Sequence, residues 1–493
     1  MAGLGVAAGV SLPRFSLAAS KDRITIYQSS VADSIHPYNH SSSPIYGQWQ
    51  HIMEPLVDMN YERGEYEGVL AESWELQGKK WVFHLRKGIR FHNGAPFTAK
   101  DVLFSIDRIR TDKTSLQKSN FKDVVEMQAG DDHTVILTLN QVHATFLDRV
   151  ENRFILSKDA HDKYGEDLDQ HPIGTGPYKF VSYQRGGNLV VARNDDYWGS
   201  KPDIKEVIFR KVTEEAARLA ALEAGQADLI NNVPVHEVER IDRHPKVRVD
   251  KVEGLRMHFV ALNPAYKPFD NKLVRQAANY SVDAHSIVKN IFDGAGFVVD
   301  GPVGRRVIGS DPNLKRYPYD PKKSRELLAK AGYPNGVEIK FYFSPGRYPK
   351  DTEVCQAIAA QMEKGGFKVQ IISQEWAIFW GTSGVNGGKL PMYYMGRGSL
   401  VDADTLYDQY FKTGTTKRVN YSNPAFDKLI DEEQKTGDHK KRVAILREAG
   451  RILMEDVPYV PLFNLADFYG VARNMIWQPP PDEKILAARI KIK

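Results

Sequence analysis

Strand-like and helix-like patterns alternate along the whole of this 493-residue chain, and no low-complexity linker separates them. Runs rich in β-branched and aromatic residues, such as RITIYQS from Arg23, KWVFHLR from Lys80 and RMHFVALN from Arg256, fit pleated, half-buried surfaces. The chain is too long for one ordinary core, so we expect two or three domains. Because no change in composition marks a boundary, we expect α/β lobes between which strands cross.

The helix candidates carry clear start and stop signals. Thr98, with Asp101 three residues later, forms a capping-box pattern before an apolar run. Asp320 before Pro321 predicts a second helix start, and Gly332 and Pro334 predict its end. Thr213 is the predicted N-cap of a third helix.

Composition excludes several classes of protein. Hydrophobic residues make up 42% and charged residues 26%, which is typical of a globular chain, and no run approaches the roughly 18 apolar residues of a membrane helix. The net charge of +5 comes from scattered basic residues, so no nucleic-acid partner is expected. The single cysteine, Cys355, allows no intrachain disulfide and no Cys-rich metal site; its helical context predicts a buried small hydrophobe.

The first twenty residues, MAGLGVAAGVSLPRFSLAAS, are small and apolar and precede a polar start at Lys21. This pattern predicts residues 1–20 as the remnant of an export signal, although the charged beginning of such a signal is missing. No cysteine follows the apolar run, so we expect an exported protein without a lipid anchor. The alternative is a disordered N-terminal tail.

Two clusters suggest enzyme or metal chemistry. Asp402 and Asp404 are two apart, which places them on opposite faces of a strand, a poor geometry for acid and base acting on one bond. A loop or helix start brings them closer, and Asp404 fits a helix N-cap. His36, His40 and His51 are close in sequence, but Pro37 and the serines after His40 favour a loop over a metal site. A hydrolase or metal-dependent enzyme remains as an alternative from a different class.

One longer segment is far more specific. AESWELQGKKWVFHLRKGIRFHNGAPFTAKDV, residues 71–102, closely resembles the signature of the bacterial extracellular solute-binding protein family 5, the peptide- and nickel-type receptors of ABC importers. IGTGPYKF from Ile173, RLAALEAGQADLI from Arg218 and YPYDPKKSRELLAKAGYPNG from Tyr317 are similar to family segments in order and spacing. The resemblance extends over residues 22–470.

The resemblance implies a two-lobed periplasmic-binding-protein clamshell, similar to class II, with an accessory subdomain inserted in the N-terminal lobe. The expected division is 21–54 and 171–257 for lobe I, 55–170 for the accessory subdomain, 258–464 for lobe II and 465–493 for a C-terminal return to lobe I. It also implies a monomeric periplasmic receptor that needs no cofactor. A small-molecule or peptide-like ligand closes the lobes, and the closed form meets the permease subunits of an ABC importer.

Three segments are expected to hold the ligand. The loop after the family's first strand contributes Ser42, Ser43 and Tyr46. Arg347 lies between a strand and a helix, where a guanidinium suits a ligand carboxylate, although it could equally be a surface arginine. The third segment is YYMGRGSLVDADTLY. Its ligand-binding candidates are Tyr394, Gly396, Arg397, Ser399 and Asp402. Trp376 and Trp380, which precede this segment, are further candidates and are proposed as aromatic walls of the site.

The third segment departs from the pattern of the family's peptide receptors. Ser399 stands where their ligand-binding aspartate is expected, and Arg397 stands where they have a tryptophan. A ligand ammonium without an anion is costly to bury, so ordinary dipeptide binding is in doubt. The sequence favours an anionic or hydroxylated solute, such as an opine-like or sugar-conjugated amino acid. The alternative is a conventional dipeptide or oligopeptide receptor in which Asp402 or Asp404 binds the amine.

Overall fold

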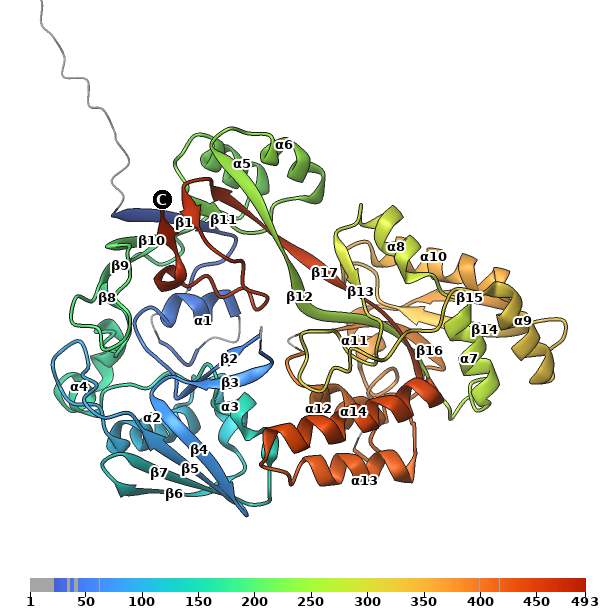
Figure 1. Ribbon diagram of the computed structural model, residues 1–493, viewed down its shortest axis with the longest axis horizontal. Coiled ribbons are helices and arrows are strands. Elements are labelled where there is room, and N and C mark those ends of the chain that lie inside the picture. The colour runs from blue at the N-terminus through green and yellow to red at the C-terminus, as the bar shows by residue number, and fades with distance from the viewer. Residues whose placement is uncertain (1–21, 33–35, 40–42, 62, 399, 416) are drawn as a thin grey trace, which may run out of the picture.

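Two lobes share one mixed sheet in the computed structural model, which describes residues 22–32, 36–39, 43–61, 63–398, 400–415 and 417–493 (Figure 1). The strand order of the large sheet is β15-β14-β16-β12-β17-β11-β1-β10-β9-β8, and β13 adds to β17. Strands β1 and β8–β11 belong to lobe I, and β14–β16 belong to lobe II. The mixed α/β clamshell expected from the sequence is therefore present.

Lobe I is built from the start of the chain and from a middle segment. Its helices and strands are β1 (Arg23–Gln28), α1 (Ser43–Trp49), β8 (Tyr178–Tyr183), β9 (Asn188–Arg193), β10 (Glu206–Lys211), α5 (Glu215–Glu223), β11 (Leu229–Ile230) and α6 (Val238–Asp242). The N-cap of α5 is Glu214, so the predicted cap at Thr213 is wrong by one residue.

A separate antiparallel sheet of order β4-β5-β7-β6 is attached to lobe I, at the lower left of Figure 1. This part of the chain holds β2 (Val57–Asn60), β3 (Glu65–Gly68), β4 (Ala71–Gln77), β5 (Lys80–Leu85), α2 (Ala99–Thr111), β6 (Val124–Asp131), β7 (Thr134–Leu139), α3 (Leu147–Val150) and α4 (Lys158–Tyr164). The predicted capping box opens α2, because the Asp101 carboxylate accepts from the backbone N–H of Thr98 at 2.9 Å.

Lobe II carries most of the long helices. Its elements are α7 (Lys272–Tyr280), α8 (Ala284–Ile291), β13 (Gly296–Val298), α9 (Pro321–Lys330), β14 (Val337–Phe343), α10 (Asp351–Lys364), β15 (Phe367–Ser373), α11 (Trp376–Trp380), β16 (Met392–Arg397), α12 (Ala403–Leu406), α13 (Pro424–Glu433) and α14 (His439–Asp456). Asp320 caps α9 as predicted, accepting from the N–H groups of Lys322 and Lys323. Cys355 is fully buried in α10.

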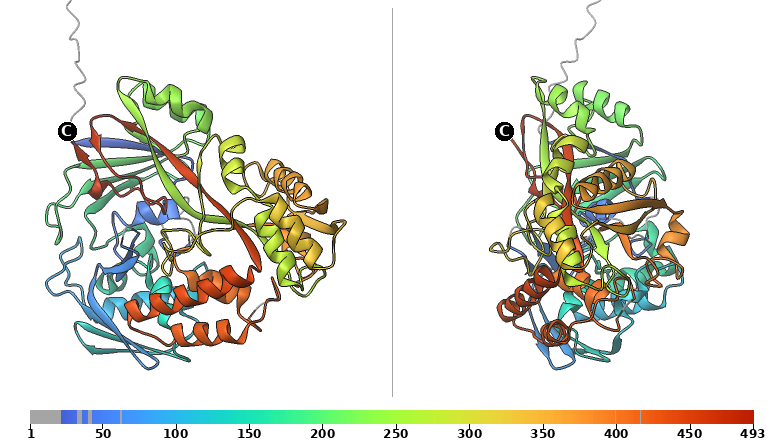
Figure 2. Two further views of the ribbon diagram at one scale, coloured as in Figure 1. Left: turned by 45° about the vertical axis from the view of Figure 1, so that its right-hand side comes forward. Right: turned by 90° about the vertical axis from the view of Figure 1, so that its right-hand side faces the viewer.

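Two long strands join the lobes. Strands β12 (Val247–Leu262) and β17 (Tyr459–Ala472) run antiparallel and stay side by side in every view (Figures 1 and 2). Their pairing is interrupted between Glu253 and Met257, in the middle of the crossing. The predicted strand from Arg256 is therefore the second half of β12. A broken ladder at this point leaves the crossing easier to bend than a continuous one.

After β17 the chain returns over lobe I, where β18 (Met475–Ile476) pairs with β19 (Lys491–Ile492). Lobe II also touches the four-stranded part directly: the N–H of Ala144 donates to the carbonyl of Gln434 at 2.9 Å. Among the helices that the structure describes, none has the length and apolar character needed to cross a membrane.

Candidate ligand-binding cleft

A cavity of about 730 Å³ lies between the lobes. Its walls come from five parts of the chain: helix α1, the four-stranded part, the β12–β17 crossing, the C-terminal return and the loops of lobe II. Its lining residues include Ser43, Tyr46, Glu151, Arg153, Arg256, His258, Arg347, Tyr348, Arg397, Asp467, Asp482 and Glu483. A solute in this cavity touches both lobes, which is the requirement for a ligand that stabilises one arrangement of the lobes.

Strand order brings three arginines to one wall. Strands β14, β16 and β12 are neighbours, and β14 and β16 run parallel. Arg347 follows the end of β14, and Arg397 is the last residue of β16. Arg397 pairs with Met257 in β12, so Arg256 lies beside it. Three guanidinium groups far apart in sequence thus meet at the same edge of the sheet.

These three arginines form no salt bridge with any residue that the structure describes. Among the described residues, no carboxylate oxygen lies within 4.0 Å of their guanidinium nitrogens. Arg397 donates to the carbonyl of Gly398 at 2.9 Å, and its Nε atom is buried without a partner. Burial, with Arg418 and Arg256 nearby, lowers the pKa of Arg397. The wall is positive, and Arg256 is also near enough to Asp467 and Glu483 to oppose the rise that burial causes in the pKa of both.

Aromatic rings keep this wall in place. The Arg347 guanidinium lies 5.2 Å from the Tyr348 ring centre and 4.7 Å from that of Trp376. Trp376 in turn stacks on Trp380, with 5.6 Å between centroids and 4° between planes. Cation–π contacts of this kind orient an arginine without neutralising its charge.

Another part of the lining is acidic. Lys484, 4% exposed, lies 2.8 Å from Asp58, 3.1 Å from Asp482 and 3.3 Å from Glu151, so it neutralises that group. Asp467 on β17 and Glu483 in the C-terminal return face the same cavity. Within the described part of the chain, neither has a basic group within 4.0 Å.

The predicted site residues divide into three groups. Ser43, Tyr46, Arg347 and Arg397 line the cavity. Behind it lie Gly396, Tyr394, Trp376 and Trp380, which support the lining residues from the lobe II side. Ser42 and Ser399 lie outside the described residues.

Tyr394 and Gly396 have packing roles. The Tyr394 hydroxyl is 2.6 Å from Nδ1 of His258, and the Tyr394 side chain is 1% exposed. Gly396 accepts from the Tyr348 hydroxyl at 3.0 Å. A Cβ atom added to Gly396 would lie 2.9 Å from Cε1 of Tyr348 and 3.0 Å from Cε1 of His258, so only glycine leaves room for both rings.

Asp402 does not face the cavity. It is 1% exposed, and its carboxylate accepts two hydrogen bonds from Arg442, at 2.6 and 2.9 Å. Asp402 is also the N-cap of α12, accepting from the N–H of Asp404, so the prediction of Asp404 as the cap is wrong by two residues. Asp404 accepts from Gln434 at 2.9 Å. The pair is therefore structural in this arrangement, and Asp402 is not available to a ligand.

The histidine cluster also has structural partners. His36 contacts the Asp112 carboxylate at 2.6 Å. His51 is buried between the Gly47 carbonyl and the Ala487 N–H, and burial lowers its pKa to about 4. His40 lies outside the described residues. In the described part of the chain no group of three or more histidine, cysteine, aspartate or glutamate side chains is arranged to hold a metal.

Sequence reasoning missed several lining residues. Arg256 is in a strand that the sequence does predict, but only the pairing of β12 with β16 shows that it meets Arg397. Asp467, Asp482 and Glu483 come from the last tenth of the chain, and their approach depends on the return of β17 across both lobes. Local sequence carries no signal for such a contact.

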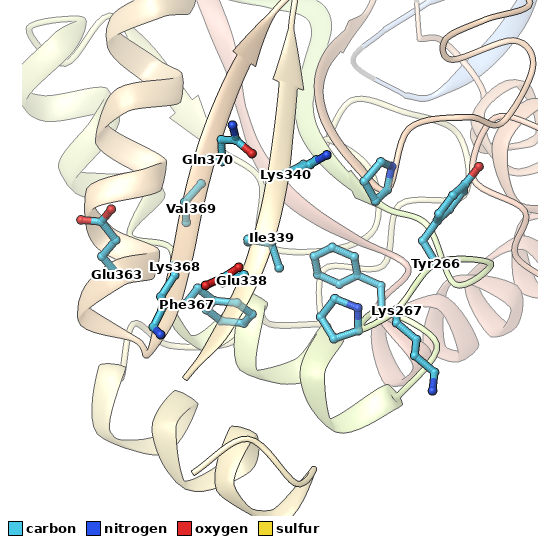
Figure 3. Close-up of a pocket in the computed structure, with 13 residues that line it drawn as sticks. Tyr266, Lys267, Glu338, Ile339, Lys340, Glu363, Phe367, Lys368, Val369 and Gln370 are labelled. Carbon is cyan, nitrogen blue, oxygen red and sulfur yellow. The ribbon is translucent and has the colours of Figure 1, made fainter. Parts of the chain in front are cut away.

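A second hollow, of about 740 Å³, lies at the outer side of lobe II (Figure 3). Its labelled side chains come from β14, β15, the end of α10 and the loop at Tyr266. Every lining residue belongs to lobe II. An occupant there would not bridge the lobes, so the ligand is assigned to the cavity between them.

A cavity walled by both halves of a hinged clamshell defines a solute-binding receptor. The model of bacterial extracellular solute-binding proteins, family 5, matches residues 65–451. Heme-binding protein A of Haemophilus influenzae is 30% identical over 465 residues, covering 87% of this chain and 83% of that protein. Di/tripeptide-binding protein 1 of Pseudomonas aeruginosa is 30% identical over 458 residues, covering 85% and 83%.

Among solved structures, the binding protein AgaA of A. tumefaciens R10, in complex with agropinic acid, is similar with a TM-score of 0.68. Its sequence identity is 26%, and the match covers 96% of this chain and 99% of that one. The chain belongs to the bacterial extracellular solute-binding protein family 5. It is a solute receptor of the ABC importer type, in a family whose members work in the periplasm.

Proposed function

We propose that this receptor captures an anionic, hydroxylated amino-acid derivative of the opine type and delivers it to a membrane permease. The observation that carries the proposal is the lobe II wall of Arg256, Arg347 and Arg397, three guanidinium groups without an acidic partner in the described structure. Unpaired arginines in a partly buried site favour carboxylates, because each guanidinium can donate two parallel hydrogen bonds.

The remaining lining suits hydroxyl groups. Ser43, Asn120, Asn152 and Thr405 supply side-chain hydroxyl and amide groups to the same cavity. Polar groups of this kind pair with sugar-like or sugar-alcohol hydroxyls rather than with apolar side chains. The agropinic acid bound by AgaA is a solute with this combination of carboxylate and hydroxyl groups.

The hydrogen bonds of Asp402 and Asp404 argue against a conventional peptide receptor. Asp402 is engaged by Arg442 and Asp404 by Gln434, so neither can bind a peptide amine without leaving its partner. Ser399, the residue at the position of the family's aspartate, still predicts loss of the usual amine site. The proposal makes dipeptides weaker ligands than opines.

Calorimetric titration of ligand-stripped protein tests this function. The panel is mannopinic acid, agropinic acid and L-alanyl-L-glutamate, which share carboxylates but differ in hydroxyl groups. We expect at least one opine to bind about tenfold or more tightly than the dipeptide, a difference of about 1.4 kcal/mol. Tighter binding of the dipeptide would overturn the proposal, as would release of a chemically altered opine, which would indicate an enzyme.

The controls separate the cleft from general effects of charge. Arg397→Met is expected to abolish measurable opine binding or to weaken it strongly. Arg325→Met is the matched control, because Arg325 is also in lobe II but donates to the Lys364 carbonyl and does not line the cavity. Equal losses in both variants would argue against a specific arginine wall.

We further propose that the receptor is exported, is not lipid-anchored and acts as a monomer. The small apolar residues of segment 1–20, with no cysteine after them, support the first two statements. Mass spectrometry of the mature protein from the native cell would test them: a lipid adduct would contradict the proposal.

A further inference from the structure

Asp467 and Glu483 form an acidic group inside the same cavity, and Arg256 is the arginine near enough to oppose the rise that burial causes in the pKa of both. Asp467 lies in β17 and Glu483 in the C-terminal return, so they come from two elements. They differ from the nearby Asp482 and Glu151, which are within reach of the Lys484 ammonium. The cavity lining therefore holds charge of both signs, and among the described residues these acids and the three arginines form no ion pair within 4.0 Å.

The surroundings hold the backbone near both acids, although Asp467 is half-buried and Glu483 is exposed. Asp467 lies against Gly254 of β12, where an added Cβ atom would come within 2.7 Å of Oδ2 of Asp467. Glu483 is joined directly to Lys484, whose ammonium is clamped among Asp58, Glu151 and Asp482. The backbone around Glu483 is thus anchored on both sides, and its carboxylate is presented to the cavity rather than free on a tail.

A second observation shows that the cavity lacks part of its hydrogen bonding. His258 lines the cavity and is fully buried, and its Nε2 atom has no partner in the described structure. Its Nδ1 atom is engaged by the Tyr394 hydroxyl at 2.6 Å. A buried polar atom without a partner is costly, so this position calls for a group supplied by a ligand.

We propose that Asp467 and Glu483 are the subsite for a positively charged nitrogen of the ligand, whose carboxylates lie on the arginines of the same cavity. This inference rests on the proposed function and adds to it the charge pattern of the solute: an amino-acid derivative that keeps a basic, secondary-amine nitrogen. A solute with carboxylates alone would leave the two acids facing each other without a cation.

The energetics support this pairing. Burial, followed by the charge of Glu483, raises the pKa of Asp467 to about 7, while Arg256 acts in the opposite direction. Burial and Asp482 raise the pKa of Glu483, and Arg256 again opposes the shift. A bound ammonium favours the ionised carboxylates and lowers both pKa values. Binding should therefore release protons near neutral pH.

The test compares two ligands on two proteins. The ligands are mannopinic acid, whose secondary amine is protonated, and its N-acetyl derivative, whose nitrogen is neutral and whose carboxylates remain. The proteins are the wild type and Asp467→Asn with Glu483→Gln, two isosteric changes. We expect the double variant to bind mannopinic acid about tenfold or more weakly, and the N-acetyl derivative with less than about a threefold change, because only the first ligand loses a charge partner.

A measurement on the unaltered protein removes any dependence on variant folding. Titration of mannopinic acid at pH 6.5 in two buffers of different ionisation enthalpy gives the number of protons exchanged. With Asp467 titrating at about 7, we expect release of roughly half a proton or more per ligand. The N-acetyl derivative should release almost none. Proton uptake, or equal exchange for both ligands, would overturn the inference.

The matched control is Glu363→Gln, which removes a carboxylate from the outer hollow of lobe II (Figure 3). It should change neither affinity nor proton release. If no opine binds to the wild type, the proposed function fails; if mannopinic acid binds and depends on Arg397 but not on Asp467 and Glu483, only the ammonium subsite fails.

Discussion

Arg397 and Arg442 belong to the same lobe, yet they illustrate two different uses of a buried arginine. Arg442 on α14 is bound by the carboxylate of Asp402, and its Nε atom lies 2.7 Å from Glu433. Arg397, five residues before Asp402, donates to the Gly398 carbonyl and forms no salt bridge within the described part of the chain. The stretch from Arg397 to Asp402 thus contains a carboxylate that is paired with Arg442 and a guanidinium that forms no salt bridge with the described residues.

The difference shows how structural and ligand-binding charges can be told apart. Charges that hold a fold are neutralised inside the fold, because an isolated buried charge is unfavourable. Charges that bind a solute are held by contacts that leave them ionised, as the aromatic rings do for Arg347. Substitutions at Arg442 should therefore lower the stability of the fold, whereas substitutions at the cavity arginines should lower the affinity for the ligand.

The largest effect is expected on stability, from Arg442→Met. This change leaves the buried Asp402 carboxylate without its cation, and breaking such a pair costs about 3–5 kcal/mol. The midpoint of urea unfolding, followed by circular dichroism, should fall accordingly. Lys440→Met, which removes an exposed cation from the start of the same helix, is the control and should change the free energy of unfolding by about 0.5 kcal/mol or less. Equal stability of both variants would contradict the comparison.

The reverse result is expected for Arg397→Met. The free energy of unfolding without ligand should stay within about 0.5 kcal/mol or rise, because the change removes a half-buried cation that has like-charged neighbours. Affinity for mannopinic acid should fall about 30-fold or more, as when one partner of a buried charge pair is truncated. Calorimetry gives the affinity, and urea unfolding gives the stability. Loss of stability without loss of affinity would place Arg397 with the structural arginines.

Gly396→Ala should disturb the positive wall through packing. The added methyl group would overlap Tyr348 and His258, and overpacking typically costs about 1–3 kcal/mol. Because Tyr348 also contacts Arg347, we expect affinity for mannopinic acid to fall as well, by about three- to tenfold. Gly301→Ala, where an added Cβ has no neighbour closer than 3.8 Å, is the control. An unchanged Gly396→Ala variant would show that Tyr348 does not fix the wall.

The sequence alone predicted the class of fold and part of the cavity. Arg347 could be found because it follows a strand, and strand ends on one edge of a sheet converge. Arg397 was found from the resemblance of its segment to the family's peptide receptors. Asp402 was placed in the site wrongly, since its partner Arg442 lies 40 residues later and no local pattern records that pairing. Asp467 and Glu483 were missed for the same reason: their position follows from strand register and from a chain return, which depend on the whole fold.

The smallest effect tests the aromatic support of Arg347. Trp376→Leu removes the ring that lies 4.7 Å from the guanidinium, and a cation–π contact of this kind is worth about 0.5–2 kcal/mol. Affinity for mannopinic acid should fall about threefold to fivefold, with a smaller loss for Trp380→Leu, which leaves the Trp376 contact intact. Arg347→Met should lose more affinity than either, because it removes the charge itself. If Trp376→Leu weakened binding as much as Arg347→Met, the Trp376 ring would itself contact the ligand. Trp376 would then be a ligand-binding residue rather than a support for the Arg347 guanidinium.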